Sequence, residues 1–214
     1  MKISPNLCYT FCYWLSRILF NLIFWMKVIG RENLPREGGC IIACNHMSYL
    51  DPVALGAGCP RQIHYMAKKS LFENRLFAKL ITSVNAFAVS ESGVGLDAIK
   101  ESLKRLAEGK VVGVFPEGAR SKNGRLKVAK WGVGFLALRS NVPVIPARII
   151  GTGQALPIGA KFIRPRPVRL YFGRPLKFQK DSAEEKRNDY SEVSRLIMKE
   201  IGSLGVKVNE DSYS

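Results

Sequence analysis

The chain has 214 residues, of which 47% are hydrophobic, and a formal net charge of +16 at pH 7. This length and apolar content predict one domain with a sizeable core, and the positive charge indicates anionic partners such as nucleic acid, lipid headgroups, phosphorylated metabolites or acidic carrier proteins. Five cysteines, an odd number without dense spacing, argue against a disulfide scaffold. With only two histidines and no C-x-x-C pair, the composition also argues against a metal site.

Residues 5–26 are almost entirely apolar and aromatic. A helix of that length would extend roughly 33 Å at ~1.5 Å per residue, enough to cross the hydrocarbon core of a membrane. Its polar residues fall in one narrow stripe, which favours a monotopic anchor that lies in the membrane interface. The stripe consists of Asn6, Thr10, Arg17 and Asn21. A spanning helix and a buried core helix are the alternatives, and a cleaved signal peptide is disfavoured because no small-residue cleavage site follows.

The chain is therefore predicted to have three parts: a membrane-anchoring helical segment (1–27), an α/β domain (28–203) and a polar tail (204–214). Basic residues close to the end of the anchor would keep the body on the cytoplasmic side if the helix spanned. These residues are Lys27, Arg31 and Arg36. The predicted location is the cytoplasmic face of the inner or cell membrane.

After Gly30, short apolar runs alternate with helical stretches. This pattern predicts an α/β fold, with a mainly parallel sheet flanked by helices in a single domain. The predicted strands cover 40–44, 62–67, 86–90, 111–115, 143–150 and 167–172. The predicted helices cover 93–107, 131–140 and 183–202. The first of these helices has Ser92 as its N-terminal cap and ends at Gly109.

The segment 45–52 reads N-H-M-S-Y-L-D-P and follows the apolar strand 40–44. Open α/β sheets bind their ligands at loops of this kind. His46 and Asp51 are five residues apart, a spacing that separates them on a helix but lets them meet in a loop that becomes helical near Asp51. Asp51 would then accept a hydrogen bond from one imidazole nitrogen, and the other nitrogen would act as a base on a substrate hydroxyl. The alternative is that Asp51 only caps a helix and His46 is an ordinary turn residue.

The same segment resembles the first block, H-x-x-x-x-D, of the glycerophospholipid acyltransferase family (the PlsC-type 1-acylglycerol-3-phosphate acyltransferases). Three further blocks follow in the expected order. Residues 67–72 read A-K-K-S-L-F and resemble A-K-x-x-L-F, residues 115–121 read F-P-E-G-A-R-S and resemble F-P-E-G-T-R-S, and residues 142–147 read V-P-V-I-P-A and resemble V-P-I-V-P-V. The resemblance covers about residues 28–175.

The resemblance implies an O-acyltransferase in which His46 is the general base and Asp51 its orienting carboxylate. The acceptor hydroxyl, in 1-acylglycerol-3-phosphate, attacks a fatty thioester directly and yields phosphatidic acid. Acyl-CoA or acyl-ACP is then a co-substrate, and no cofactor or metal is expected, so EDTA should not inhibit. The chain has no G-x-S-x-G elbow to present a serine nucleophile. Ser48 is accordingly interpreted as a loop hydrogen-bonding residue and Cys44 as a buried strand residue.

Five residues are assigned to substrate binding by the resemblance: Glu117, Gly118, Arg120, Lys68 and Lys130. Arg120 offers a planar fork for a phosphate, and glycine lets a ligand approach the backbone. Further basic residues follow Arg120 in the loop, where solvated charge is the alternative interpretation. These residues are Lys122, Arg125 and Lys127.

One position departs from the family pattern. Glu91 stands where the G-x-F-x-V-x-R block of the family has its arginine. A carboxylate at that place would repel a phosphate. A different lysophospholipid or other lysolipid acceptor, such as a lyso-ornithine lipid, is therefore a second hypothesis.

A second basic group surrounds strand 167–172 and comprises Lys161, Arg164, Arg166, Arg169, Arg174, Lys177 and Lys180. An anionic membrane surface is the partner that this group favours, with an acidic acyl carrier protein or the phosphates of coenzyme A as alternatives. Nucleic acid is not expected, because no nucleic-acid-binding motif accompanies the charge. Two other functions stay open: a non-catalytic membrane-binding protein that keeps the fold, and a thioesterase in which water replaces the alcohol.

Overall fold

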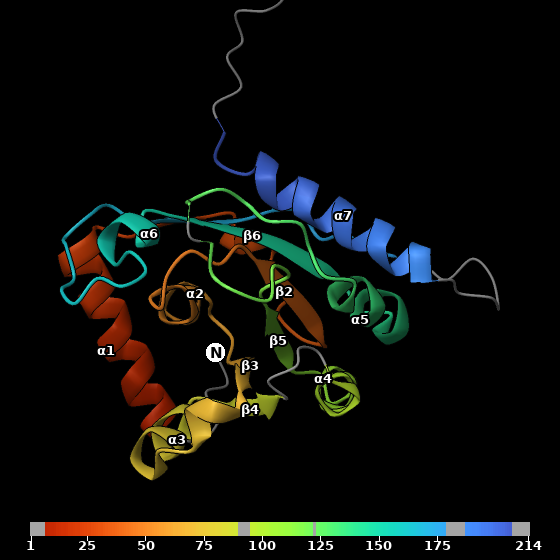
Figure 1. Cartoon of the computed structure of the whole chain (residues 1–214), viewed down its shortest axis with the longest axis horizontal. Helices are drawn as coiled ribbons and strands as arrows, with labels where there is room; N and C mark the ends of the chain where they lie inside the picture. The colour runs from red at the N-terminus through yellow and green to blue at the C-terminus, as the bar shows by residue number, and fades with distance from the viewer. Residues whose placement is uncertain (1–6, 90–94, 122, 179–186, 207–214) are drawn as a thin grey trace, which may run out of the picture.

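The computed structural model describes residues 7–89, 95–121, 123–178 and 187–206 (Figure 1). Within this part of the chain, a seven-stranded sheet has the order β1-β7-β6-β2-β5-β3-β4. Neighbouring strands are parallel except for the antiparallel pair β6–β7. The strands are β1 Lys27–Ile29, β2 Cys40–Cys44, β3 Ile63–Lys68, β4 Ala86–Val89, β5 Val111–Val114, β6 Val144–Ile150 and β7 Arg169–Phe172.

Helices cover both faces of the sheet. The helices are α1 Leu7–Phe24, α2 Asp51–Gly58, α3 Arg75–Ser83, α4 Leu96–Ala107, α5 Gly132–Ser140, α6 Thr152–Ala155 and α7 Arg187–Ser203, with short 3-10 turns η1 Arg31–Asn33 and η2 Lys69–Phe72. Figure 1 shows α1 and α2 on one side of the sheet and α4, α5 and α7 on the other. The predicted single α/β domain with a mainly parallel sheet is confirmed.

β2 is the central strand and is buried along its whole length. Cys40, Ile42 and Cys44 face the layer of α1 and α2. Ile41 and Ala43 face the layer of α4, α5 and α7. A strand buried on both faces reads as a continuous apolar run, and this is why its bounds agree with the sequence prediction.

α1 is part of the body of the domain as well as an exposed apolar helix. Phe20, Phe24 and Met26 belong to the hydrophobic core on the α1/α2 side. Burying a phenylalanine side chain contributes about 1.5–3 kcal/mol to stability. The predicted boundary after residue 27 falls inside β1, which pairs with β7 at the far edge of the sheet.

The remaining predictions differ from the structure mostly at element ends. β1, α3 and α6 were not expected, and α4 begins at Leu96 with Gly95 as its N-terminal cap. Gly109 ends the α4 segment with φ of 75°, a conformation that glycine adopts without a steric penalty. Some predicted features lie outside the described residues. These are Asn6, Glu91, Lys122, Lys180, the Ser92 cap and most of the 204–214 tail.

His64 in β3 was interpreted as structural, and it contacts the guanidinium of Arg105 in α4 through Nδ1. Burial lowers the pKa of His64 to about 4, with further contributions from the positive charges of Arg105 and Lys110. Between pH 6.5 and 4 only the unfolded chain therefore takes up a proton at this residue. The free energy of unfolding should fall as the pH decreases through that interval.

We expect the His64→Gln variant to lose this part of the pH dependence, because glutamine does not titrate and can still accept from Arg105. Urea unfolding of both proteins at several pH values between 4 and 7 would measure the difference. If the free energies of unfolding of the two proteins changed with pH in the same way over the whole interval, the lowered pKa of His64 would be contradicted.

Candidate active site

The site lies where two adjacent parallel strands end. β2 leads into the loop that carries His46, and β5 leads into residues 115–121. Because β2 and β5 are paired and parallel, their carboxyl ends meet at the same edge of the sheet. Two motifs about 70 residues apart are thereby brought into direct contact, as the His46–Glu117 hydrogen bond shows.

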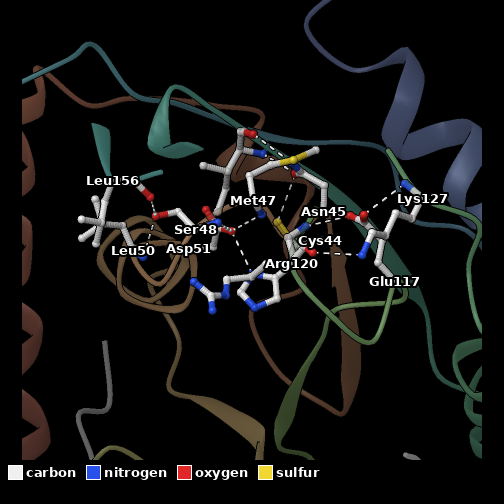
Figure 2. Close-up of polar contacts among 12 residues, drawn as sticks. Cys44, Asn45, Met47, Ser48, Leu50, Asp51, Glu117, Arg120, Lys127 and Leu156 are labelled. Atoms are coloured by element: carbon white, nitrogen blue, oxygen red, sulfur yellow. Dashed lines mark hydrogen bonds and ion pairs between the residues drawn. The ribbon is translucent and has the colours of Figure 1, made fainter. Parts of the chain in front are cut away.

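One oxygen of Asp51 organises the first loop (Figure 2). Asp51 Oδ2 lies 2.9 Å from Nδ1 of His46 and accepts the backbone N–H groups of Met47 at 2.6 Å and Ser48 at 2.7 Å. The Asp51 side chain is fully buried. Within the described part of the chain, its other oxygen has no hydrogen-bond partner. All the polar contacts of this carboxylate therefore go through one atom.

The local sequence explains how residues five apart meet. α2 begins at Asp51, and Pro52 follows at the start of the helix, where a proline is tolerated and a carboxylate is favoured by the helix dipole. The N–H of Asp51 donates to the carbonyl of Ser48 at 3.3 Å, which closes the turn. The Ser48 hydroxyl donates to the carbonyl of Leu156, as expected for a loop residue. The predicted meeting of His46 and Asp51 is confirmed.

The contacts of His46 define its tautomer. Asp51 Oδ2 accepts two backbone N–H groups and is an acceptor toward the ring as well, so the ring proton lies on Nδ1. Nε2 is then the basic nitrogen. The ring stacks on Phe115 with centroids 4.2 Å apart, and 18% of the side chain is exposed. This arrangement holds the imidazole in one orientation and leaves it open on one side.

Glu117 holds the backbone around His46. Its Oε1 accepts the N–H of His46 at 2.8 Å, and its Oε2 accepts the N–H of Lys127 at 3.0 Å. The N–H of Ser121 donates to the carbonyl of His46 at 2.8 Å. Both the backbone N–H and the backbone carbonyl of His46 are therefore hydrogen-bonded to the 115–121 segment. Burial raises the pKa of Glu117, partly offset by the two backbone hydrogen bonds.

Sequence reasoning missed this bridging role. Glu117 is only 4% exposed, and both of its oxygens are bound to backbone. Its predicted contact with the acceptor stays a prediction. Asn45 was also missed: its amide pairs with both backbone groups of Ile149 in β6, at 3.0 Å and 2.7 Å. An asparagine directly before the histidine of the motif was the available signal.

Arg120 lies over the ring of Tyr49, with its guanidinium carbon 3.4 Å from the ring centroid. A cation over an aromatic face is attracted by the ring electrons and is restricted in its motion. Tyr49 is 65% exposed, so this pair lies at the surface of the site.

The other predicted binding residues are near the same sheet edge. Gly118 has φ of 68°, and a Cβ there would come within 2.7 Å of the Lys130 side chain. The left-handed φ favours glycine at position 118, and the exposed Lys130 side chain lies against it. Lys68 is the last residue of β3 and is also exposed. Strand β5 lies between β3 and β2 in the sheet. The structure brings Gly118 and Lys130 into contact and leaves Lys68 two strands away from His46.

The fold and the site indicate a class of enzyme: an α/β protein with a histidine–carboxylate pair at the carboxyl edge of its sheet and no serine elbow in its sequence. A family model described as Acyltransferase matches residues 26–150. The chain belongs to this acyltransferase family, which confirms the resemblance found in the sequence.

Individual relatives support the same family assignment. A 1-acyl-sn-glycerol-3-phosphate acyltransferase from Bacillus subtilis is 35% identical over 169 residues, covering 78% of this chain and 82% of that protein. One from Borreliella burgdorferi is 26% identical over 201 residues, covering 90% and 80%. The crystal structure of the 1-acyl-sn-glycerophosphate (LPA) acyltransferase PlsC from Thermotoga maritima matches with a TM-score of 0.73 at 22% identity, over 97% of this chain and 85% of that one. At this low sequence identity, the structural match shows that the two chains share a fold.

The role of Glu117 can be tested with Glu117→Gln. The new amide would set an NH₂ group against one of two backbone N–H donors, which should cost about 1–3 kcal/mol of stability. Displacement of His46 should lower kcat by on the order of 10²-fold. Thermal unfolding and steady-state kinetics would measure both effects. A rise in the KM for the acceptor at unchanged kcat and stability would instead show direct substrate binding.

Proposed function

We propose that this protein transfers a fatty acyl chain from a thioester donor, acyl-CoA or acyl-ACP, to the free hydroxyl of 1-acylglycerol-3-phosphate, and so forms phosphatidic acid. The observation that carries the proposal is the His46–Asp51 pair, with Nδ1 bound and Nε2 left as a base. The names of the relatives from Bacillus subtilis and Borreliella burgdorferi supply the acceptor.

The reaction needs one base and one direct attack. Nε2 of His46 takes the hydroxyl proton while the oxygen attacks the thioester carbonyl. The new C–O bond forms, the C–S bond breaks, and the imidazolium returns the proton to the departing thiolate. Asp51 stabilises the imidazolium through Nδ1 and keeps the ring oriented. No step calls for a metal or a cofactor, and we propose that none is used.

Arg120 is the residue best placed to hold the phosphate of the acceptor. It carries a planar fork of donors and lies at the open surface of the site, over Tyr49. Lys130 beside Gly118 adds a second positive charge near the 115–121 segment, and Lys68 a third at the same sheet edge. A phosphate bound there would place the glycerol hydroxyl toward His46.

We also propose that α1 anchors the enzyme to the cytoplasmic face of the membrane. By length and composition this helix is apolar enough to cross a bilayer, and only 17% of its residues are buried in the protein. Its exposed side includes Phe11, Trp14, Ile18 and Leu22. The basic group around β7 supports contact with anionic lipid, because Lys161, Arg164, Arg166, Arg169, Arg174 and Lys177 are all exposed.

The general base is tested by His46→Ala. We expect turnover to fall by roughly 10²–10⁴-fold or more, because the proton of the attacking hydroxyl then has no acceptor. The backbone clamps from Glu117 and Ser121 remain, so the variant should keep its fold by circular dichroism. The assay is mass spectrometry of product from acyl-CoA and from acyl-ACP. A folded variant with near-normal turnover would refute the mechanism.

The phosphate site is tested by Arg120→Lys, with Arg125→Lys as a matched control because Arg125 is an exposed arginine of the following loop. Loss of the bidentate fork and of the contact with Tyr49 should raise the KM for 1-acylglycerol-3-phosphate about tenfold, a cost of about 1.4 kcal/mol. The control should stay close to wild type. Equal effects of the two substitutions would contradict a specific role for Arg120.

The acceptor is tested with a panel of lysolipids and one labelled donor. Preference for the phosphate-bearing acceptor would support the proposal in spite of Glu91. Preference for a lysolipid without a terminal phosphate, such as a lyso-ornithine lipid, would replace the acceptor but keep the reaction. Hydrolysis of the donor alone would indicate a thioesterase, and membrane binding without any product would indicate a non-catalytic protein.

A further inference from the structure

α3 presents apolar side chains that the described part of the chain leaves uncovered. None of its residues is buried. Leu76 is 81% exposed, Leu80 48% and Phe77 43%, and their spacing of one, three and four residues puts them on one side of the helix. Leu71, in the preceding turn, is 40% exposed.

The helix itself is well formed in spite of this exposure. Asn74 caps its N-terminus, with its side-chain oxygen accepting the N–H groups of Leu76 at 3.1 Å and Phe77 at 3.0 Å. A helix of nine residues is marginal in water unless it packs against something. Large apolar side chains gathered on the outer side of such a helix indicate a binding surface.

This surface is continuous with α1. The thiol of Cys8 in α1 donates to the Ser83 hydroxyl at the end of α3, at 3.2 Å. Figure 1 shows α3 beside one end of α1, on the same side of the molecule. The exposed apolar side of α1, described above, therefore has α3 as its neighbour.

The contacts of α1 show how it meets a bilayer. Near its N-terminus, the Tyr9 hydroxyl accepts the N–H of Ile63 in β3, and near its C-terminus Phe20 and Phe24 are buried in the core. The helix has 18 residues and is roughly 27 Å long. A helix held to the body along most of that length lies parallel to the membrane surface, with its outer side in the lipid. α3 then lies at the same boundary.

The charges near α3 fit an anionic surface. Arg75 and Lys79 lie within the helix, and Lys68 and Lys69 precede it in the chain, all of them exposed. Glu73 is the acidic residue among them and is also exposed. Basic side chains beside an apolar face are typical of helices that lie in the interface of anionic membranes.

We propose that the apolar side of α3, formed by Leu76, Phe77 and Leu80 with Leu71, is a second membrane-docking surface that inserts into an anionic bilayer next to α1. The inference rests on the proposed anchoring by α1 and is independent of the proposed reaction. It also has a consequence for the active site. η2 links α3 to Lys68 at the carboxyl edge of the sheet, so docking of α3 brings that edge close to the lipid headgroups.

The test is binding of the full-length chain to vesicles of phosphatidylcholine, with and without phosphatidylglycerol, by co-sedimentation. Leu76→Ser/Leu80→Ser is compared with Leu96→Ser/Val206→Ser. Leu96 and Val206 are 75% and 57% exposed, but Leu96 is the first residue of α4 and Val206 follows the end of α7, and both helices cover the other face of the sheet. We expect the α3 variant to bind phosphatidylglycerol vesicles at least tenfold more weakly and the control to bind like wild type. Equal binding by the two variants would overturn the proposal.

A charge variant, Arg75→Gln/Lys79→Gln, should weaken binding to phosphatidylglycerol vesicles at low salt and leave binding to neutral vesicles unchanged. The rival partner is an acidic acyl carrier protein. If Leu76→Ser/Leu80→Ser bound vesicles normally but lost its affinity for immobilised acyl carrier protein, α3 would be a protein-docking helix and the lipid assignment would be wrong.

Activity separates this proposal from the proposed reaction. The α3 variant should keep wild-type turnover on a short-chain, water-soluble lysolipid and lose turnover on a long-chain acceptor embedded in vesicles. An equal loss on both substrates would mean that α3 does not act through membrane docking. A wild-type protein that bound vesicles through α3 but acylated no acceptor would refute the reaction and leave the docking surface intact.

Discussion

The geometry of the site depends on one buried oxygen, Oδ2 of Asp51. A carboxylate without exposure to solvent carries a large desolvation cost, and three N–H groups converging on one atom offset it. Each hydrogen bond to a charged acceptor contributes about 1.5–3 kcal/mol. The same three contacts that keep Asp51 buried also shape the turn and set the tautomer of His46. The stability of the loop and the orientation of His46 therefore depend on the same three contacts.

The topology of the sheet supplies the second constraint. β2 and β5 are adjacent and parallel, so the loop that carries His46 and the loop that carries Arg120 begin at the same edge. Glu117 then joins them by accepting one N–H from each side of the site. A change in the 115–121 segment therefore reaches His46 through these backbone hydrogen bonds, and also through the stacking of Phe115 on the imidazole. The two sequence motifs form one structural unit.

Much of this was predictable because the elements concerned have strong local signals. β2 is a continuous apolar run, and the H-x-x-x-x-D spacing allowed the correct pairing of His46 with Asp51. β1 was missed because its three residues become a strand only by pairing with β7. α3 was missed because its nine residues are too few for a helical period to be recognised with certainty from the sequence. The role of Glu117 depends on where two distant backbones meet, and no local pattern of residues contains that information.

The two surfaces of α1 connect the proposed chemistry with the proposed membrane anchoring. Its inner side adds Phe20 and Phe24 to the core that also supports α2, and α2 begins at Asp51. Its outer side is apolar and exposed. The helix that would contact lipid is thus packed against the helix whose first residue orients His46. A lysolipid has its chain in the bilayer and its phosphate at the surface. An enzyme anchored in this way would meet the substrate at the depth where its hydroxyl lies, without having to extract it into water.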